Sequence, residues 1–315
     1  MALIKAADIP SLSLLYRLRK LSPVAPGTEV PPTHLGPKTD TPLPAPSKSF
    51  NDRVGLLRGD ITSLVADAIV NAANRSLLGG GGVDGAIHKV AGPELYDECQ
   101  QLGGCKTGSA KITGGYSLPS RHVIHAVGPI YNHLSPDDSE RLLTGCYTRS
   151  LELAVEHGCK TIAFSAISTG VYGYPSREAA PAALGAIRKF LAGPDGAKLD
   201  KVIIVTFEMK DQDAYKEYIP LYFPPVTKDS ASPASDEDNT EETSANKQDS
   251  ENHQITKNTA SPEKSNGTKQ TEAELDAEAQ AVANELPSAP TSEPSSSRSP
   301  DEPGHIDKKQ KQSKD

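Results

Sequence analysis

The chain has 315 residues, with 41 Asp and Glu against 33 Lys and Arg, so its formal net charge is −8 and its length suits one large domain or two small ones. Residues 226–315 hold 19 acidic and 10 basic side chains and no Phe, Tyr or Trp, whereas residues 1–225 are nearly balanced. No run approaches the ~18 apolar residues that cross a bilayer, which argues against an integral membrane protein. The four Cys residues form no CxxC pair, which favours a reducing compartment; we expect the cytoplasm, the nucleus or both, with the mitochondrion as the alternative.

The first 49 residues divide into two segments. Within residues 1–21, Leu14, Leu15 and Leu18 share one helical stripe, which predicts a helix docked on the folded domain. A mitochondrial presequence is the alternative interpretation of the same residues. Residues 22–49 carry eight prolines between positions 22 and 47, and we expect an extended Pro-rich connector.

Residues 226–315 are predicted to be a disordered acidic tail. They are rich in Ser, Thr, Pro, Glu and Lys and offer too little apolar surface to offset the entropy of ordering, roughly 1–2 kcal/mol per residue. Thr271 and Glu274 have capping-box spacing at the start of an Ala- and Glu-rich stretch, which suggests a helix that folds on an unidentified protein. A solvated spacer is the competing interpretation.

Residues 50–225 alternate strand and helix signals in chain order. Apolar runs predict strands at residues 54–57, 68–70, 121–127, 161–166 and 201–207. Amphipathic segments predict helices at residues 83–102, with a break at Gly92 and Pro93, and at residues 139–157, 176–191 and 212–218. Continuous apolar strands need cover on both faces, so we expect a three-layer α/β/α domain with a mixed, mostly parallel sheet.

Three loops follow predicted strands and are expected to meet at one cleft, because ligands of open α/β sheets bind beyond the carboxyl ends of the strands. The first is GDIT at residues 59–62, the second runs from NAAN at 71–74 to four glycines at 79–82, and the third is STGVYG at 168–173. Successive glycines before a helix let backbone amides approach an anion, so the second and third loops together could hold a diphosphate. A flexible turn is the alternative for the four glycines alone.

Several polar side chains in these loops suit a nucleotide sugar. Asp60 could cap the turn that follows it or accept a hydrogen bond from an exocyclic amine. Asn71 and Asn74 could hold their own backbone or offer an amide to vicinal hydroxyls. Asp84 and His88 are stacked one helical turn apart, so the carboxylate could hold a water or a hydroxyl that His88 orients.

Other chemistries lack their patterns. Gly80, Gly82 and Gly85 match GxGxxG, but the preceding strand lies about eight positions earlier than a dinucleotide fingerprint requires, and no Walker A loop, GxSxG or HExxH is present. No His, Cys and carboxylate group has the sequence spacing of metal ligands, so we expect neither a metal nor a cofactor. No Lys and Arg stripe is interleaved with aromatic residues, which argues against nucleic-acid binding.

Taken in order, GDIT, NAAN, GGGGVDGAIH, GCKTGSAKIT, HAVGP and ISTGVYGYP resemble a macrodomain, and in detail its MacroD-type subclass. The resemblance covers roughly residues 53–222, just over half the chain. It implies a hydrolase that removes mono-ADP-ribose from acidic side chains of modified proteins and deacetylates O-acetyl-ADP-ribose. The partners it implies are ADP-ribosylated proteins, ADP-ribose and O-acetyl-ADP-ribose; we expect a monomer.

The resemblance also implies residue roles. Asp60 and the Ile61 amide would bind adenine, Tyr172 would close over the distal ribose, and water would attack beside Asp84. The expected catalytic residues are Asn74, Asp84, His88 and Gly170, whose missing side chain leaves room for the scissile end. The expected ligand-binding residues are Asp60, Ile61, Asn71, Gly80, Gly81, Gly82, Val83, Ser168, Thr169, Val171 and Tyr172.

A module that binds ADP-ribose without hydrolysing it is the main alternative. GDIT and the two glycine loops would serve such a module equally well. Asn74, Asp84 and the GVYG segment favour the enzyme.

Overall fold

The computed structural model describes residues 2–24 and 43–226, so the expected acidic tail and most of the expected connector lie outside the described residues. Six strands form the main sheet in the order β2-β8-β7-β4-β6-β5, in which every neighbouring pair is parallel except β5 with β6. Two short strands form a separate parallel pair. The strands are β1 (Ile4–Lys5), β2 (Val54–Arg58), β3 (Leu64–Val65), β4 (Ala68–Ala73), β5 (Ser109–Gly114), β6 (His122–Val127), β7 (Thr161–Phe164) and β8 (Lys201–Thr206).

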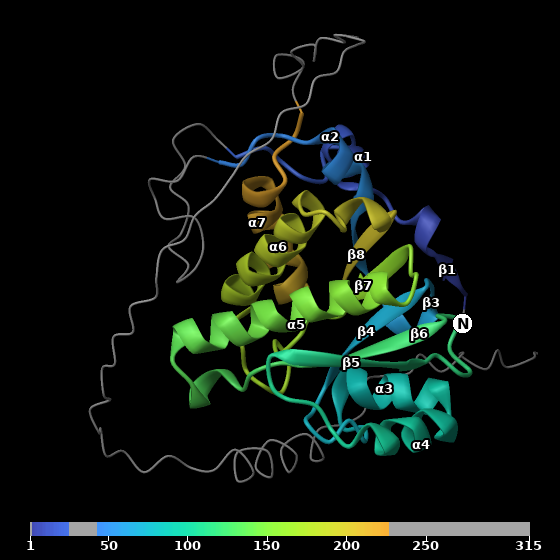
Figure 1. The fold of residues 1–315 in the computed structure, drawn as a ribbon. Coiled ribbons are helices and arrows are strands. Elements are labelled where there is room, and N and C mark those ends of the chain that lie inside the picture. Colours follow the sequence, from blue (N-terminus) through green and yellow to red (C-terminus); the bar gives the residue numbers. More distant parts are fainter. Residues whose placement is uncertain (1, 25–42, 227–315) are drawn as a thin grey trace, which may run out of the picture.

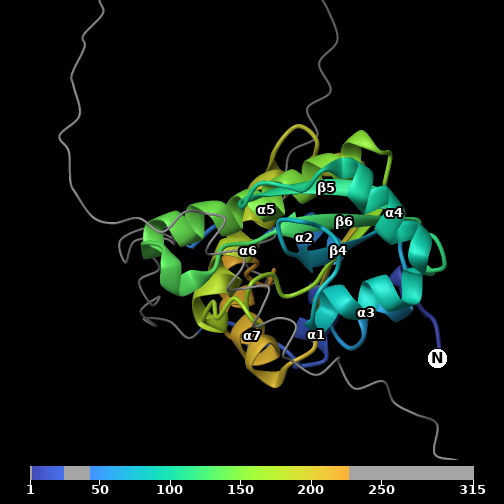
Figure 2. The same cartoon turned by 90° about the horizontal axis from the view of Figure 1, so that it is seen from below.

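Helices cover both faces of the sheet, which confirms the predicted three-layer architecture (Figure 1). The α-helices are α1 (Leu12–Arg17), α2 (Lys48–Arg53), α3 (Gly82–Ala91), α4 (Pro93–Leu102), α5 (Pro136–Glu156), α6 (Ser176–Ala192) and α7 (Met209–Tyr222). The short 3-10 helices are η1 (Ala6–Asp8), η2 (Ile61–Ser63), η3 (Tyr131–His133) and η4 (Gly196–Lys198). Helices α3 and α4 lie on one face, and α5, α6 and α7 lie on the other (Figure 2).

The central strands show why continuous apolar runs predicted a sandwiched sheet. In β4, Ile69 belongs to the core beneath α3 and α4, whereas its neighbour Val70 belongs to the core beneath α5 and α6, and both are wholly buried. Successive side chains of a strand point to opposite faces, so a strand covered on both faces must be apolar at every position. Among the described residues, no helix combines the length and apolar character needed to cross a membrane.

The structure confirms one detail of the predicted elements and adds a strand that was not predicted. The helix expected at residues 83–102 is two helices, because Gly92 takes a φ of 93° and Pro93 starts α4, as the Gly-Pro break predicted. The edge strand β5 was not predicted, since its sequence SAKITG lacks the apolar run of a buried strand and only one of its edges is paired.

The N-terminal helix packs where the two ends of the domain meet. Ser11 caps α1 by accepting from the Leu14 amide, and Leu12 is wholly buried in the core. Tyr16 donates to the Phe223 carbonyl at 2.9 Å. Helix α2 starts at Lys48, two residues inside the stretch expected to be extended, because the Ser47 side chain caps it.

Candidate functional site

A cavity of about 110 Å³ opens where β4, β6 and β7 end and helix α3 begins. Both glycine-rich loops contribute to its wall, so the structure brings together two segments about 90 positions apart in the sequence, as the strand ends predicted. The expected site residues that line it are Asn74, Gly80, Gly81, Gly82, Val83, Asp84, Ser168, Gly170, Val171 and Tyr172.

The first wall is the N-terminus of α3. Gly79 and Gly82 have φ angles of 84° and 63°, which residues with side chains rarely adopt. A Cβ on Gly85 would lie 2.3 Å from the Gly80 carbonyl oxygen, so the glycine there lets the loop fold against the helix. The N-cap residue Gly81 has no side chain to cap α3, so the first amides of the helix, which belong to residues lining the cavity, remain available as donors for an anion.

The second wall is the loop at residues 168–173, which its surroundings hold in place. Ser168 has a φ of 66°, and a Cβ on Gly128 would lie 2.0 Å from its hydroxyl oxygen. Lys210 donates to the Thr169 carbonyl at 2.9 Å, and the Tyr131 amide donates to the Tyr172 carbonyl at 3.0 Å. Ser168 is among the residues that line the cavity, and its hydroxyl is buried without a hydrogen-bond partner among the described residues.

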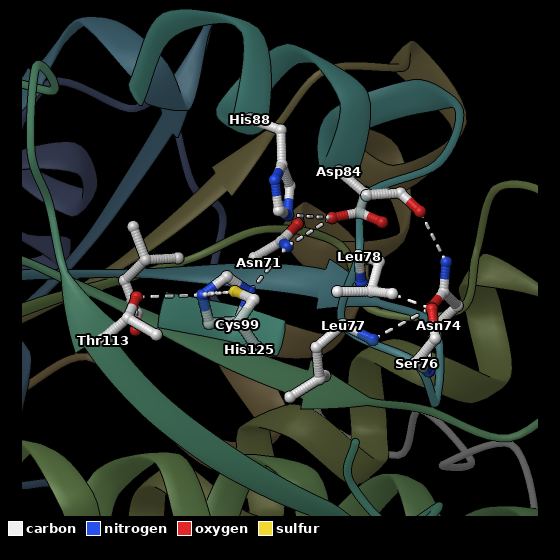
Figure 3. Close-up of polar contacts among 12 residues, drawn as sticks. Asn71, Asn74, Ser76, Leu77, Leu78, Asp84, His88, Cys99, Thr113 and His125 are labelled. Atoms are coloured by element: carbon white, nitrogen blue, oxygen red, sulfur yellow. Dashed lines mark hydrogen bonds and ion pairs between the residues drawn. The ribbon is translucent and has the colours of Figure 1, made fainter. Parts of the chain in front are cut away.

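Asp84 is the charged group at the inner end of the cavity, and it is only 3% exposed. Its Oδ1 accepts from Asn71 Nδ2 at 2.6 Å and lies 3.5 Å from His88 Nε2 (Figure 3). Burial raises the pKa of Asp84 to about 6, although the hydrogen bond from Asn71 acts in the opposite direction. A carboxyl with a pKa near neutrality suits a group that accepts a proton from water.

Asn71 and His88 lie behind Asp84 and do not line the cavity. Asn71 is wholly buried in β4 and also contacts His125 Nδ1 at 3.2 Å. Burial lowers the pKa of His88, so its ring is neutral beside the carboxyl. The structure therefore favours a role in which both residues support Asp84 rather than contact a ligand directly.

His88, Cys99 and His125 come together although their sequence spacing predicted no cluster, and their potential ligand atoms lie within 4.8 Å of one another. The atoms of Cys99 and His125 already have roles in hydrogen bonding. His125 Nε2 lies 3.0 Å from the Thr113 hydroxyl and 3.5 Å from Cys99 Sγ, and burial raises the pKa of the Cys99 thiol to about 12. Metal binding needs a thiolate and an unprotonated ring nitrogen, so we assign the cluster to a hydrogen-bond network.

The adenine-binding residues expected from the resemblance lie away from the cavity wall. Asp60 caps η2 by accepting from the Thr62 amide and hydroxyl at 2.9 and 2.8 Å, and Ile61 is buried in the core. They follow β2, which β8 separates from β7. Thr169 is also outside the cavity lining, because its side chain turns back to the Ala166 carbonyl.

Sequence reasoning missed Phe207. This side chain is 50% exposed and directly follows β8, whose last residue, Thr206, pairs with Arg58 at the end of β2. Phe207 and Asp60 therefore leave neighbouring strands at the same edge of the sheet. An aromatic residue at the carboxyl end of the strand predicted at residues 201–207 was the signal that could have found it.

Asn74 organises its own loop. Its Oδ1 accepts from the amides of Ser76 and Leu77 at 3.0 and 3.1 Å, and its Nδ2 donates to the Gly79 carbonyl at 2.8 Å. The sequence left two interpretations of Asn74 open. The structure shows the hydrogen bonds of the one in which the Asn74 side chain holds the backbone of its own loop. Asn74 therefore fixes the path of the chain into the four glycines.

Replacing Asn74 with Ala is expected to lower thermal stability and, together with it, the affinity for ADP-ribose that the family resemblance implies. The variant loses three side-chain bonds to loop backbone, each worth about 1 kcal/mol net, so the melting midpoint should fall by several degrees. Calorimetric titration and thermal melting measure the two effects. Ser76→Ala is the matched control, since it leaves those three bonds in place; a normal melting midpoint and normal affinity for Asn74→Ala would contradict the loop-holding role.

Comparison with known proteins adds the family context. Residues 70–183 match the family model described as Macro domain. "ADP-ribose glycohydrolase MACROD1" of Rattus norvegicus is 50% identical over 190 residues, covering 60% of this chain and 73% of the relative. The MACROD1 protein of Bos taurus is 52% identical over 188 residues, covering 59% of this chain and only 57% of the relative. "Macro domain-containing protein CT2219" of Chlorobaculum tepidum is 54% identical over 167 residues, covering 53% of this chain and 95% of the relative.

Solved structures agree with these matches. The macro domain of ganglioside induced differentiation associated protein 2 has a TM-score of 0.60 at 30% identity, covering 72% of this chain and all of that chain. A Trypanosoma brucei macrodomain in complex with ADP-ribose has a TM-score of 0.50 at 40% identity, covering 64% of this chain and 75% of that chain.

Proposed function

The chain belongs to the macrodomain family, and on that premise we propose that it removes mono-ADP-ribose from acidic side chains of modified proteins and deacetylates O-acetyl-ADP-ribose. One observation carries the proposal: a buried carboxyl, Asp84, stands at the inner end of a cavity whose two walls offer backbone donors. The relatives named as ADP-ribose glycohydrolases and the family structure solved with ADP-ribose support the same chemistry.

The diphosphate would lie between the N-terminus of α3 and the loop at residues 168–173. The first amides of α3 and the Ser168 hydroxyl would donate to its oxygens. A helix N-terminus contributes about 0.3–1 kcal/mol toward an anion, and up to ~2 kcal/mol when partly buried. Lys210, through its bond to the Thr169 carbonyl, would hold the second loop against the diphosphate and bring a positive charge beside it.

The adenine would lie at the edge shared by β2 and β8. Asp60 uses Oδ1 to cap η2, so its Oδ2 remains as an acceptor for an exocyclic amine. The exposed ring of Phe207 offers a surface on which a base can stack. The base would then lie beyond the cavity wall, and the distal ribose would lie in the cavity beside Asp84.

Replacing Phe207 with Ala is expected to weaken ADP-ribose binding, since stacking on an aromatic side chain is worth about 1–3 kcal/mol per base. Phe207→Tyr keeps the ring and should bind normally. Titration calorimetry with ADP-ribose and with ribose 5-phosphate separates the contribution of the base to the binding free energy from that of the sugar phosphate. Equal loss of affinity for both ligands would contradict stacking, because ribose 5-phosphate has no base.

In the proposed reaction, a water beside Asp84 attacks the anomeric carbon of the distal ribose or the ester carbonyl. Asp84, or a phosphate oxygen of the substrate, accepts the proton of the water. At the anomeric carbon, the bond to the protein carboxylate breaks and the carboxylate leaves with the electron pair. At the carbonyl, the ribose oxygen leaves and takes up the proton. Gly170 leaves room at this end because it has no side chain.

Incubation of the full chain with an auto-ADP-ribosylated protein tests the proposal. We expect release of free ADP-ribose, and titration calorimetry should show preference for ADP-ribose over AMP and NAD. Binding of ADP-ribose without release, from either the modified protein or O-acetyl-ADP-ribose, would leave the reader module as the function. The buried carboxyl at the cavity is the feature that favours the hydrolase, because a reader has no need of a proton acceptor there.

A further inference from the structure

His125 is wholly buried in the strand next to one edge of the sheet, and Asn71 lies between it and the carboxyl that faces the cavity. It lies in β6 directly beside Asn71 of β4, since the two residues are partners in the parallel register. Its ring nitrogens contact three side chains, Asn71 through Nδ1 and both Thr113 and Cys99 through Nε2 (Figure 3). Neither the sequence patterns nor the cavity lining assign any role to this residue.

The hydrogen bonds fix which nitrogen of the ring carries the proton. The amide nitrogen of Asn71 can only donate, so His125 Nδ1 must accept. The Thr113 hydroxyl donates to the carbonyl of Gly114 at 3.1 Å, so its oxygen is left to accept from His125 Nε2. Burial lowers the pKa of His125 to about 3, and the ring is therefore neutral with its proton on Nε2.

The Asp84 carboxylate, which can only accept, requires the same orientation of Asn71 independently of His125. One proton of its amide is directed to His125 Nδ1, and the other is directed to Asp84 Oδ1 at 2.6 Å. With the amide reversed, its oxygen would face the carboxylate and a ring nitrogen that has no proton, and both contacts would be repulsive. Every hydrogen bond of this network is therefore donated in the direction that leads away from Asn71, to Asp84 on one side and through His125 to Thr113 on the other.

We propose that His125 is a positioning residue, which as the neutral Nε2–H tautomer holds the Asn71 amide in the orientation that donates to the Asp84 carboxylate. The expected effect on the reaction rests on the proposed function. The tautomer of His125 and the titration of Asp84, by contrast, are properties of the protein alone. His125 itself touches neither the cavity nor a ligand.

The hydrogen bond from Asn71 offsets part of the effect of burial on Asp84. If the amide is no longer held, the carboxylate loses this donor and its pKa rises above the present value of about 6. The other titratable groups that face Asp84 are His88 on α3, Cys99 on α4 and His125 on β6, and each is neutral because burial lowers the pKa of both rings and raises that of the thiol. The Asn71 bond is therefore the main interaction near Asp84 that favours its ionised form.

Two substitutions separate positioning from packing. His125→Asn places an amide oxygen where Nδ1 now accepts, whereas His125→Phe fills similar volume with no acceptor. We expect His125→Phe to move the acid limb of the pH–rate profile upward by about one unit, which lowers kcat about twofold at pH 7 and about tenfold at pH 5, with a small change in KM. His125→Asn should recover most of both effects. Equal losses in the two variants, or an unshifted acid limb in His125→Phe, would overturn the proposal.

Nuclear magnetic resonance supplies a readout that does not depend on hydrolysis. In the wild-type full chain, the ¹⁵N shifts of His125 should show a protonated Nε2 and an unprotonated Nδ1 between about pH 6 and 8. The ¹³C titration of the Asp84 carboxyl should shift to higher pH in His125→Phe and return in His125→Asn. A proton on Nδ1 in the wild type overturns the proposal even where neither variant folds, and a wild type without hydrolase activity overturns the proposed function alone.

Discussion

Replacing Asp84 with Asn is expected to lower kcat for release of ADP-ribose by about 10²–10⁴-fold, the usual contribution of a well-placed proton acceptor. ADP-ribose affinity should change much less, because the donors for the diphosphate come from the glycine loops. Asn is nearly isosteric, and its amide oxygen can still accept from Asn71 Nδ2, so the buried network keeps its partners. The effect on turnover then reports the missing proton acceptor rather than a collapsed site.

The measurement combines steady-state kinetics on a modified protein with titration calorimetry. Asp84→Ala is the comparison variant; it should lose turnover equally and stability as well, since it leaves the Asn71 amide buried without its acceptor. Wild-type rates in Asp84→Asn would remove Asp84 from the proton-transfer step and leave the substrate phosphate as the acceptor.

The same carboxyl predicts a pH dependence with a definite sign. Because burial raises its pKa to about 6, turnover should fall as the pH drops through about 6, where Asp84 takes up a proton. The pH dependence of stability has the opposite sign to that of turnover, since the folded state binds this proton more tightly than the unfolded chain does. The Asp84 contribution to the free energy of unfolding should therefore decrease as the pH rises from about 4 to about 6. Asp84→Asn should lack this contribution.

Replacing Gly170 with Glu is expected to lower ADP-ribose affinity at least about 100-fold without loss of stability. A Cβ at Gly170 would meet no atom within 4 Å, so the protein can accept a side chain there. Gly170 lines the cavity, however, and a carboxylate beside a bound diphosphate costs several kcal/mol through repulsion of like charges.

Calorimetry and thermal melting check both halves of this prediction. Gly170→Ala should weaken binding far less, and Ala197→Glu, which adds the same charge at an exposed position in η4, should bind normally. Unchanged affinity in Gly170→Glu would mean that the ligand does not reach the loop at residues 168–173. A large fall in the melting midpoint would instead contradict the open space seen around this glycine.

The three-layer fold was predictable because its signals are local. Continuous apolar runs such as Ile69–Val70 require cover on both faces, and parallel strands bring the loops after β4 and β7 to one edge. The two walls of the cavity follow from that topology. By contrast, β5 is held by its pairing with β6 rather than by its own apolar character, and no local pattern identifies it.

Residue roles were harder to predict because they depend on contacts across the sheet. Nothing in the sequence near His125 indicates that it lies beside Asn71, 54 positions earlier. The spacing of Asp84 and His88 correctly predicted their proximity, since both lie on α3. For Asn74 the local pattern allowed two interpretations, and only the bonds to its neighbours distinguish them.

The contact between the ends of the domain determines how the protein can be attached to a surface. Asn51 of α2 donates to the Pro224 carbonyl at 2.8 Å, and α2 leads directly into the start of β2. The chain therefore leaves the domain near the edge where the parallel strands begin, whereas the cavity opens at the edge where they end. A coupling group placed at Val226, which is 42% exposed at this end of the domain, should therefore orient the mouth of the cavity toward solution and leave it accessible to large modified proteins.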